Sequence, residues 1–562
     1  MSGDLRNALF LFALQNAVRH KSLPKAGTVI GMVMGKHPEF RDRAKEASAL
    51  MPGVIGEVTA LSPEERETRL AELSPELAED LARPRVHIRE LPELENAGSG
   101  VVMRFAPNPS GPLHLGHARA AVLNDAYVRR YGGKYILRIE DTDPKRVDPG
   151  AYRMVPEDLA WLGVTIHEVV YQSDRFDLYH RYGKDLIGRG GAYVCFCENV
   201  QFKEMKLART ACPCRGKTIE ENLDLFERML AGEFEEGEVT VRVRTDLEHP
   251  DPAMRDFPIF RVLKEPLHPR VEATVYPLMN FSVTVDDHLL GVTHVIRGKD
   301  HIANTRRQRY IYDYFGWPVP VYRHYGRMGI EGVILSTSQM REGIRSGIYQ
   351  GWDDIRLGTL RALARRGIEP AAVREAMIDI GIGDTDISFS WDNLYAHNRV
   401  LVDPRADRYF FVPDPVRLKV EGAPVETAFA LLHPNDPSRG RRELLFLGEV
   451  LLPRKELSGS TGLLRLKDLF NVRVRPEGDS YSLAYAGGDL AEARAARAPI
   501  VQWLPAESSI PGILLTQEGP VAGAFETGAG CVPGTVVQFE RVGFARIDRV
   551  EPQELIAYFC HR

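Results

Sequence analysis

The sequence predicts a multidomain α/β protein with an additional all-β region, and three features indicate this. From residue 100 to about 325, β-prone runs alternate with helical segments, as in a doubly wound parallel sheet. After residue 401, short β-prone runs separated by Gly, Pro and Asp are typical of β-barrels. Helical periodicity before residue 98 favours a small helical extension. At 562 residues the chain is too long for one core.

The composition excludes several classes of protein. The hydrophobic content of 44% and charged content of 27% are ordinary for a globular protein. No run approaches the ~18–20 apolar residues of a membrane span, and Met1–Asn7 lacks the features of a secretory signal. With six cysteines in the whole chain, we expect no disulfide scaffold and a cytoplasmic protein. The net charge of −5 argues against nonspecific binding to DNA, but it allows a local basic groove for RNA.

The first 98 residues contain no catalytic pattern. Ser62-Pro63-Glu64-Glu65 is typical of a helix start, with an N-cap serine, proline at the first helical position and acids in the first turn. We therefore expect an exposed amphipathic helix from Glu64 to Leu81. Residues 90–100 are the predicted linker. The role of this extension, whether in RNA contact or partner docking, is left open.

Residues 103–117 are the stretch around which the rest of the chain is organised. Met103–Ala106 is apolar enough for a buried strand, and apolar residues recur with helical spacing from Leu113 onward. The prolines and glycine between them exclude regular structure. His114 and His117 are three residues apart and share one side of the first helical turn. The free N–H groups of a helix start favour a polyphosphate, to which two imidazoles can donate.

These residues carry a resemblance to a known family. His114-Leu115-Gly116-His117 resembles the HIGH motif of class I aminoacyl-tRNA synthetases, and the stretch that begins at Arg104 is similar to their glutamyl and glutaminyl subgroup. The resemblance continues in order through Arg138–Asp143, Tyr276–Asn280 and Val295–His301. The β-prone tail is similar to archaeal-type glutamyl-tRNA synthetases, because bacterial ones end in a helical domain.

The resemblance implies a division of the chain. Residues 99–325 would form a class I Rossmann-type catalytic domain, with an acceptor-stem-binding insertion at about 190–275. Residues 326–400 would form a KMSKS-like loop and helical connector, and residues 401–562 a β-barrel anticodon-binding region. Residues 1–98 would be an N-terminal helical extension.

The implied reaction is the ligation of glutamate to tRNA(Glu). ATP with Mg²⁺ and L-glutamate would give glutamyl-adenylate, and the acyl group would pass to the 3′-terminal adenosine. Whether tRNA(Gln) is also charged, leaving a product for an amidotransferase, is left open.

Two stretches match the family's phosphate-binding motifs. The catalytic candidates are His114, His117, Ser336 and Ser338, and those for ATP binding are Gly116, Asp300, His301, Ser336, Ser338 and Arg341. Glycine at position 116 would let the nucleotide approach closely. Archaeal-type relatives usually have lysine where this chain has Gln339, so Arg341 is a candidate replacement cation. A mobile Ser/Thr loop is the alternative interpretation.

Glutamate carries two carboxylates and one ammonium group, so its pocket needs arginines and an acid. By resemblance, the candidate residues are Arg104, Glu140, Tyr276, Asn280 and Arg297. Glutaminyl enzymes have an uncharged residue at the position of Arg297. A buried positive charge there suits a γ-carboxylate, whereas an amide would leave it uncompensated. The arginine therefore argues against the alternative function, that of a glutaminyl-tRNA synthetase.

The cysteines form a C-x-C…C-x-C pattern, with Cys195 and Cys197 separated from Cys212 and Cys214 by 14 residues. Four thiolates satisfy a structural Zn²⁺ site, which would stabilise a small insertion. Because C-x-C is less diagnostic than C-x-x-C, free thiols remain the alternative.

No local sequence motif identifies the residues that would contact RNA. Basic candidates in and after the insertion are Arg242, Arg244, Arg255, Arg261, Arg306 and Arg307, although solvated surface charges would give the same pattern. A weakly active RNA-binding paralogue is a further alternative, which Gln339 favours. The intact histidines, Arg104 and Glu140 argue against it.

Overall fold

The computed structural model describes the chain apart from residues 1, 21–22, 25, 76, 78–89, 99, 459–461, 479, 531 and 552–553. The chain divides into two compact units, Met1–His87 and Ile88–Arg562. In the described part of the chain, no helix has both the length and the apolar character needed to cross a membrane.

The N-terminal unit is helical. Its main helices are α1 (Ser2–His20), α2 (Ala26–Lys36), α3 (Ala44–Ala60) and α4 (Pro63–Leu73). Ser62 caps α4 as predicted: its hydroxyl accepts from the Glu65 N–H, and the Glu65 carboxylate accepts from the Ser62 N–H. The helix ends at Leu73, earlier than predicted, because Pro75 follows directly after Ser74. The last residues of the predicted helix, 78–81, lie outside the described residues.

The second unit contains a five-stranded parallel sheet with the order β3-β2-β1-β8-β9. Its strands are β1 (Val102–Phe105), β2 (Lys134–Ile139), β3 (Glu168–Tyr171), β8 (His294–Gly298) and β9 (Val321–Tyr325). The connecting helices include α6 (Leu115–Tyr131), α7 (Ala151–Trp161), α8 (Phe176–Gly188), α11 (Met279–Leu289) and α12 (Ile302–Phe315). The strand order reverses between β1 and β8. Open α/β sheets bind ligands at the carboxyl ends of the strands at such a point.

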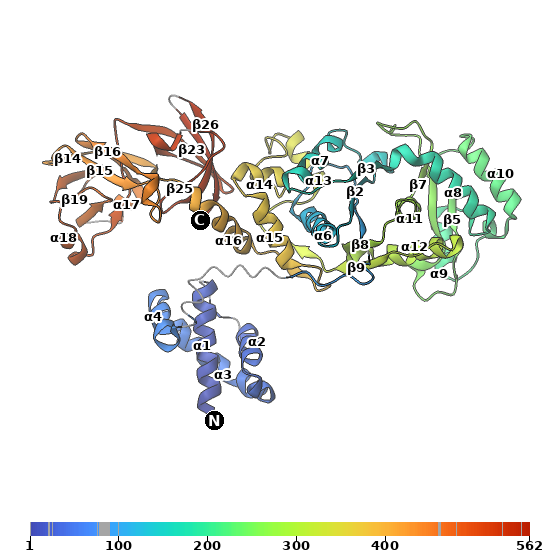
Figure 1. Cartoon of the computed structure of the whole chain (residues 1–562), viewed down its shortest axis with the longest axis horizontal. Coiled ribbons are helices and arrows are strands. Elements are labelled where there is room, and N and C mark those ends of the chain that lie inside the picture. The colour runs from blue at the N-terminus through green and yellow to red at the C-terminus, as the bar shows by residue number, and fades with distance from the viewer. Residues whose placement is uncertain are drawn as a thin grey trace. The chain divides into compact units, whose positions relative to one another are not determined.

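A second, antiparallel sheet interrupts this alternation. Its strands, in the order β4-β5-β6-β7, are β4 (Ala192–Cys195), β5 (Thr240–Val243), β6 (Phe257–Val262) and β7 (Val275–Pro277). The helices α9 (Asn199–Leu207) and α10 (Ile219–Leu230) belong to the same region, and α10 packs beside α8 (Figure 1). Phe226 of α10 and Phe260 of β6 are fully buried in its core.

A helical region follows β9. It contains the short strands β10 (Met328–Gly329) and β11 (Ile387–Ser388) and the helices α13 (Thr337–Arg345), α14 (Leu360–Arg366), α15 (Pro370–Ile380) and α16 (Trp391–Val402). Arg119 connects α6 to this region. Its buried guanidinium donates to the carbonyl of Gly326 at 2.7 Å and to that of Gly381.

The C-terminal region is almost entirely β, with two seven-stranded sheets and one two-stranded sheet. The first sheet has the order β12-β25-β26-β27-β23-β24-β13, and its strands are β12 (Arg408–Tyr409), β13 (Phe411–Pro413), β23 (Ser509–Thr516), β24 (Gly519–Glu526), β25 (Val536–Phe539), β26 (Gly543–Glu551) and β27 (Glu554–His561). The second has the order β21-β18-β19-β20-β14-β17-β22, with β14 (Pro415–Glu421), β17 (Glu449–Pro453), β18 (Gly462–Leu466), β19 (Asn471–Glu477), β20 (Ser480–Tyr485), β21 (Ile500–Val501) and β22 (Leu504–Pro505). The remaining elements are β15 (Glu426–Leu431), β16 (Arg441–Phe446), α17 (Arg454–Ser458) and α18 (Leu490–Ala495).

The predicted fold class is therefore confirmed, with a parallel α/β sheet, N-terminal helices and C-terminal barrel-like sheets.

Arg366 of α14 attaches the helical region to the last strand. This arginine is 2% exposed and donates to the Cys560 carbonyl at 2.6 Å and to the Tyr395 hydroxyl at 2.9 Å.

We predict that Arg366→Met destabilises this attachment by about 1–3 kcal/mol, because the buried carbonyl loses a charged donor. Hydrogen exchange should show faster exchange of the β27 amides than in the wild type. Arg441→Met, at an exposed position of β16, is the control and should leave β27 unchanged. Equal protection of β27 in all three proteins would contradict this role of Arg366.

Candidate active site

Five of the predicted site residues line one cavity at the carboxyl ends of β1 and β8. It has a volume of about 490 Å³, and its lining includes Arg104, His117, Glu140, Arg297, Gly298, His301 and Arg261. A larger cavity of about 840 Å³ lies beside β9, but none of the predicted site residues is among the described residues that line it. We therefore take the smaller cavity as the candidate active site, because the strand order reverses and charged groups meet there.

The two histidines stack on each other at the start of α6. Their ring centroids are 3.7 Å apart, and His114 is the N-cap residue. The Nδ1 atom of His114 accepts from the Gly116 N–H at 3.1 Å, and that of His117 accepts from the His114 N–H at 3.4 Å. Burial lowers the pKa of His114 to about 4. Burial and the charge of His114 lower the pKa of His117 well below its usual range.

Both rings are therefore neutral at pH 7, and their tautomers follow from these bonds. Because each Nδ1 accepts a backbone N–H, each proton is carried by Nε2. The Nε2–H groups are then the donors that the rings can offer to a ligand. Gly116 is required by this arrangement, since a Cβ there would lie 2.9 Å from Cε1 of His114.

The second predicted phosphate-binding stretch lies against the turn that precedes α6. Ser336 caps α13, and its hydroxyl lies 3.0 Å from that of Ser338. The guanidinium of Arg341 donates to the Ser110 carbonyl and lies 3.4 Å from Asp148. Ser336, Ser338 and Gln339 are exposed, so their side chains are accessible to a ligand.

Gly358 joins the two stretches through the backbone. Its carbonyl accepts from the Leu115 N–H at 2.9 Å, and its N–H donates to the Ile334 carbonyl at 3.2 Å. A Cβ at Gly358 would lie 2.6 Å from the Leu335 side chain, which explains the need for glycine here.

The arginines of the cavity differ in how their charges are compensated. Arg104 donates to Asp287 at 3.2 Å, and Arg138 donates to Asp287 at 2.6 Å and to Glu140 at 3.0 Å. Arg297 is 8% exposed and forms no ion pair with any residue that the structure describes. Burial, and then the charge of Arg104, lowers the pKa of Arg297 to about 10. An uncompensated buried guanidinium of this kind favours an anionic ligand.

Several predicted residues are not in the lining of this cavity: the phosphate-binding candidates His114, Gly116, Ser336, Ser338 and Arg341, and three more residues, Tyr276, Asn280 and Asp300. Tyr276 is 1% exposed and packs edge-on against Phe176, with ring centroids 5.3 Å apart. The side-chain oxygen of Asn280 is buried, and no described residue donates to it. Asp300 is exposed and lies 3.5 Å from His301, which does line the cavity.

Sequence reasoning missed Asp287, which binds both Arg104 and Arg138. It occurs in a Val-Asp-Asp-His run on α11, and helical spacing gives no signal that this acid faces a sheet. Two of the arginines proposed for RNA contact are also buried. Arg242 covers the Phe202 ring at 3.6 Å, and Arg255 donates to carbonyls such as that of His249 at 2.7 Å. These two arginines therefore stabilise the antiparallel-sheet region and are not free for phosphate.

The four cysteines of the C-x-C pairs come together between β4 and the segment before α10. The Sγ atoms of Cys195 and Cys212 are 4.0 Å apart, and those of Cys197 and Cys214 are 3.9 Å apart. The Sγ atoms of Cys195, Cys197 and Cys212 all lie within 4.8 Å of one another. Sulfurs that bind Zn²⁺ at about 2.3 Å would be about 3.8 Å apart, so these three thiols are candidate ligands, and Cys214 joins them through its contact with Cys197.

The model for tRNA synthetases class I (E and Q), catalytic domain, matches residues 100–403, and the corresponding anti-codon binding domain model matches residues 406–483. The chain is 63% identical to a glutamate–tRNA ligase of Methanoculleus marisnigri, and the match covers 100% of both chains. It is 60% identical to the ligase of Methanocorpusculum labreanum, covering 100% of this chain and 99% of the relative. For the ligase of Methanocaldococcus jannaschii the identity is 49%, covering 98% and 99%. The chain therefore belongs to the class I tRNA synthetases of the E and Q group.

Proposed function

We propose that this protein is a glutamate–tRNA ligase that uses ATP to join L-glutamate to the 3′-terminal adenosine of tRNA(Glu). The observation that carries the proposal is the uncompensated, buried Arg297 in the same cavity as Arg104, Glu140 and His117. Full-length relatives with identities up to 63%, which are named glutamate–tRNA ligases, support it.

The reaction has two steps. An oxygen of the glutamate α-carboxylate attacks the α-phosphorus of ATP, and the bond to the bridging oxygen of pyrophosphate breaks. The 2′-hydroxyl of the terminal adenosine then attacks the carbonyl carbon of glutamyl-adenylate, and AMP leaves. Neither step needs a nucleophilic side chain, because positioning and charge stabilisation supply the catalysis.

The residues around the nucleotide supply hydrogen-bond donors. Neutral His114 and His117 donate from Nε2 to phosphoryl oxygens, while Ser336 and Ser338 donate from the loop beside the turn. Arg341 supplies the cation that the loop needs, since position 339 is glutamine. Gly116, Asp300 and His301 are assigned to adenosine. Mg²⁺ commonly binds to substrate phosphates with few protein ligands, so it would arrive on ATP.

The proposed amino-acid pocket contains two arginines: Arg104, which is paired with Asp287, and Arg297, whose hydrogen-bond partners are uncharged. Arg297 binds the γ-carboxylate of glutamate, Arg104 binds the α-carboxylate, and Glu140 binds the ammonium group. Tyr276 and Asn280 remain assigned to the neutral contacts of the pocket, and the unpartnered oxygen of Asn280 supports this role. Glutamine is disfavoured because its amide would leave Arg297 buried without a counter-charge, typically at a cost of a few kcal/mol.

Two further regions of the chain are assigned to tRNA binding. Residues 99–325 form the catalytic domain, in which about 190–275 bind the acceptor stem. Residues 326–400 carry the second phosphate loop, and residues 401–562 bind the anticodon, in keeping with the anti-codon domain match at 406–483. Residues 1–98 have no assigned partner. The cytoplasm, where thiols stay reduced, is the proposed compartment.

A structural Zn²⁺ held by Cys195, Cys197, Cys212 and Cys214 is part of this proposal. The sulfur–sulfur distances of 3.9 and 4.0 Å support it. When bound, the ion would link β4 to the segment before α10. It has no part in the chemistry, because nothing in the reaction requires a thiolate.

We predict that labelled glutamate is transferred to tRNA(Glu) and that glutamine is not transferred. Aminoacylation assays on tRNA(Glu) and tRNA(Gln), with both amino acids, test this directly. Charging of tRNA(Gln) with glutamate would identify a nondiscriminating enzyme, whose product needs an amidotransferase. Transfer of glutamine alone would contradict the role of Arg297. If nothing is transferred, Gln339→Lys separates a weak enzyme, which it should activate, from an RNA-binding paralogue.

A second prediction concerns the pH dependence of folding. The pKa of His114 is lowered by burial to about 4. The unfolded residue titrates near 6.5. The neutral ring therefore contributes stability above pH ~6.5 that is lost as the pH falls toward 4. Between pH 7 and 5 the loss should be about 1–2 kcal/mol, and at most about 3 kcal/mol overall.

The variant His114→Asn keeps a capping acceptor but removes this titration. Denaturant unfolding at pH 7 and pH 5 should therefore show a smaller loss of stability in the variant than in the wild type. Identical pH dependence of His114→Asn and wild type would disprove the neutral state of His114.

A third prediction is that the purified protein contains about one zinc ion per chain. Cys214→Ser should release it and make the region around β4 sensitive to proteolysis. Cys560→Ser, which removes a buried thiol of β27, should keep the metal. Elemental analysis that finds no zinc in protein purified without chelator would leave the cysteines as free thiols.

A further inference from the structure

The guanidinium of Arg297 is held in place by two residues of the neighbouring helix. Its Nη2 donates to the hydroxyl of Thr305 and to the side-chain oxygen of Gln308, the latter at 2.9 Å. Both partners lie on α12, three residues apart, and therefore on the same face of that helix. Gln308 is completely buried, so its oxygen is fixed by packing. The Tyr322 ring covers the guanidinium at 5.0 Å.

These two partners share one property, which is that neither carries a charge. By contrast, Arg104 and Arg138 of the same region are both bound by the carboxylate of Asp287. The charges of Asp287 and Glu140 act on Arg297, but both acids are bound by Arg138. The positive charge of Arg297 is therefore held in position without being neutralised.

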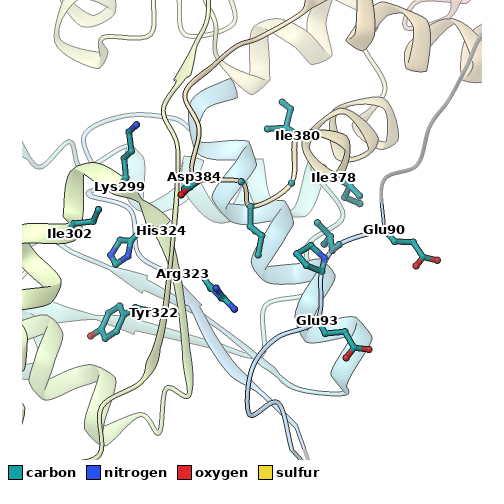
Figure 2. Close-up of a pocket in the computed structure, with 15 residues that line it drawn as sticks. Glu90, Glu93, Lys299, Ile302, Tyr322, Arg323, His324, Ile378, Ile380 and Asp384 are labelled. Atoms are coloured by element: carbon teal, nitrogen blue, oxygen red, sulfur yellow. The ribbon is translucent and has the colours of Figure 1, made fainter. Parts of the chain in front are cut away.

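A third neutral residue, His324, contacts Thr305. The Nε2 atom of His324, on β9, is 2.8 Å from the Thr305 hydroxyl. Burial, and then the charge of Arg297, lowers the pKa of His324 to about 4, so this ring also adds no charge of its own at pH 7. Figure 2 shows His324 and Tyr322 at the wall of the larger cavity, with Ile302 at the start of α12 beside them.

We propose that Thr305 and Gln308 are positioning residues that set the preference for glutamate over glutamine by holding Arg297 through uncharged hydrogen bonds. The inference rests on the proposed function and adds residues that the sequence motifs do not include. Thr305 and Gln308 touch Arg297, and they act on the substrate only through it.

The neutrality of these partners is what gives the preference. A buried guanidinium without a counter-charge gains most from an anionic ligand and loses most from a neutral one. A carboxylate at position 308 would pair with Arg297 and remove that difference. In that variant the charge of Arg297 is already neutralised by the new carboxylate, which also repels the γ-carboxylate of glutamate. The amide of glutamine would no longer leave a buried charge uncompensated.

The decisive variant is Gln308→Glu, which adds a negative charge beside Arg297 but barely changes the shape of the side chain. The kcat/KM for glutamate should fall about 10- to 100-fold, through a higher KM for glutamate. The KM for ATP should stay within about twofold of the wild type, because Arg297 does not contact ATP. The ratio of glutamate to glutamine activation should fall at least about tenfold. A purely structural role would lower both activities together and leave this ratio unchanged.

Three variants at Thr305 keep the test valid if Gln308→Glu does not fold. Thr305→Asp introduces the same charge at a half-buried position and should lower the ratio in the same way. Thr305→Val removes a hydrogen bond without adding charge. It should raise the KM for glutamate severalfold and keep the ratio within about threefold, and Thr305→Ser should restore the wild-type KM.

A matched control is Gln15→Glu, which places a carboxylate at a buried glutamine of the N-terminal unit. Gln15 is 4% exposed and lies outside the catalytic region. This variant should keep the wild-type ratio, whatever its effect on stability. If folded Gln308→Glu and Thr305→Asp both keep the wild-type ratio, the inference is overturned. A wild-type protein that activates no glutamate would instead overturn the proposed function itself.

Discussion

One buried carboxylate oxygen joins the elements on which the site depends. Oδ1 of Asp287, on α11, accepts from Arg104 of β1 and from Arg138 of β2. Burial alone would raise the pKa of Asp287, but the two guanidinium groups outweigh it and hold the pKa below its usual range. The acid is therefore charged, and two neighbouring parallel strands are linked to the helix that packs on them. Removing one partner of such a buried set typically costs 3–5 kcal/mol, roughly, because an unpaired charge remains.

This arrangement divides three arginines between structure and binding. Arg138 is fully buried, and the acids Asp287, Glu140 and Asp286 raise its pKa in spite of burial. Arg104 shares Asp287 but also lines the cavity. Among the described residues, the hydrogen-bond partners of Arg297 are uncharged. In a cavity of about 490 Å³, the charge available to a ligand is thus set less by how many arginines are present than by which of them already has a carboxylate.

The sequence predicted local features well and long-range ones poorly, for physical reasons. His114 and His117 were found because helical spacing alone brings them together. The β character of the region after residue 401 was also predicted, because short β-prone runs separated by Gly, Pro and Asp are visible in the residues themselves. Burial of Arg242 and Arg255 was not predicted, because a buried arginine needs carbonyl or aromatic partners that lie elsewhere in the chain. For the same reason Asp287, Thr305 and Gln308 could be recognised only once Arg104 and Arg297 had been placed beside them.

Gln339 occupies a position of the second phosphate loop where archaeal-type relatives usually have lysine, so the positive charge of this loop must come from another residue. Arg341 lies two residues after Gln339, and it donates to the carbonyl of Ser110 in the turn that leads to His114. Its other contact is Asp148 at 3.4 Å, whose backbone N–H donates to the Pro109 carbonyl of the same turn. A cation is therefore already fixed to the turn by its backbone. The neutral histidines bring donors but no charge. We therefore propose this guanidinium as a positive group for the phosphates of ATP, with part of its charge compensated by Asp148.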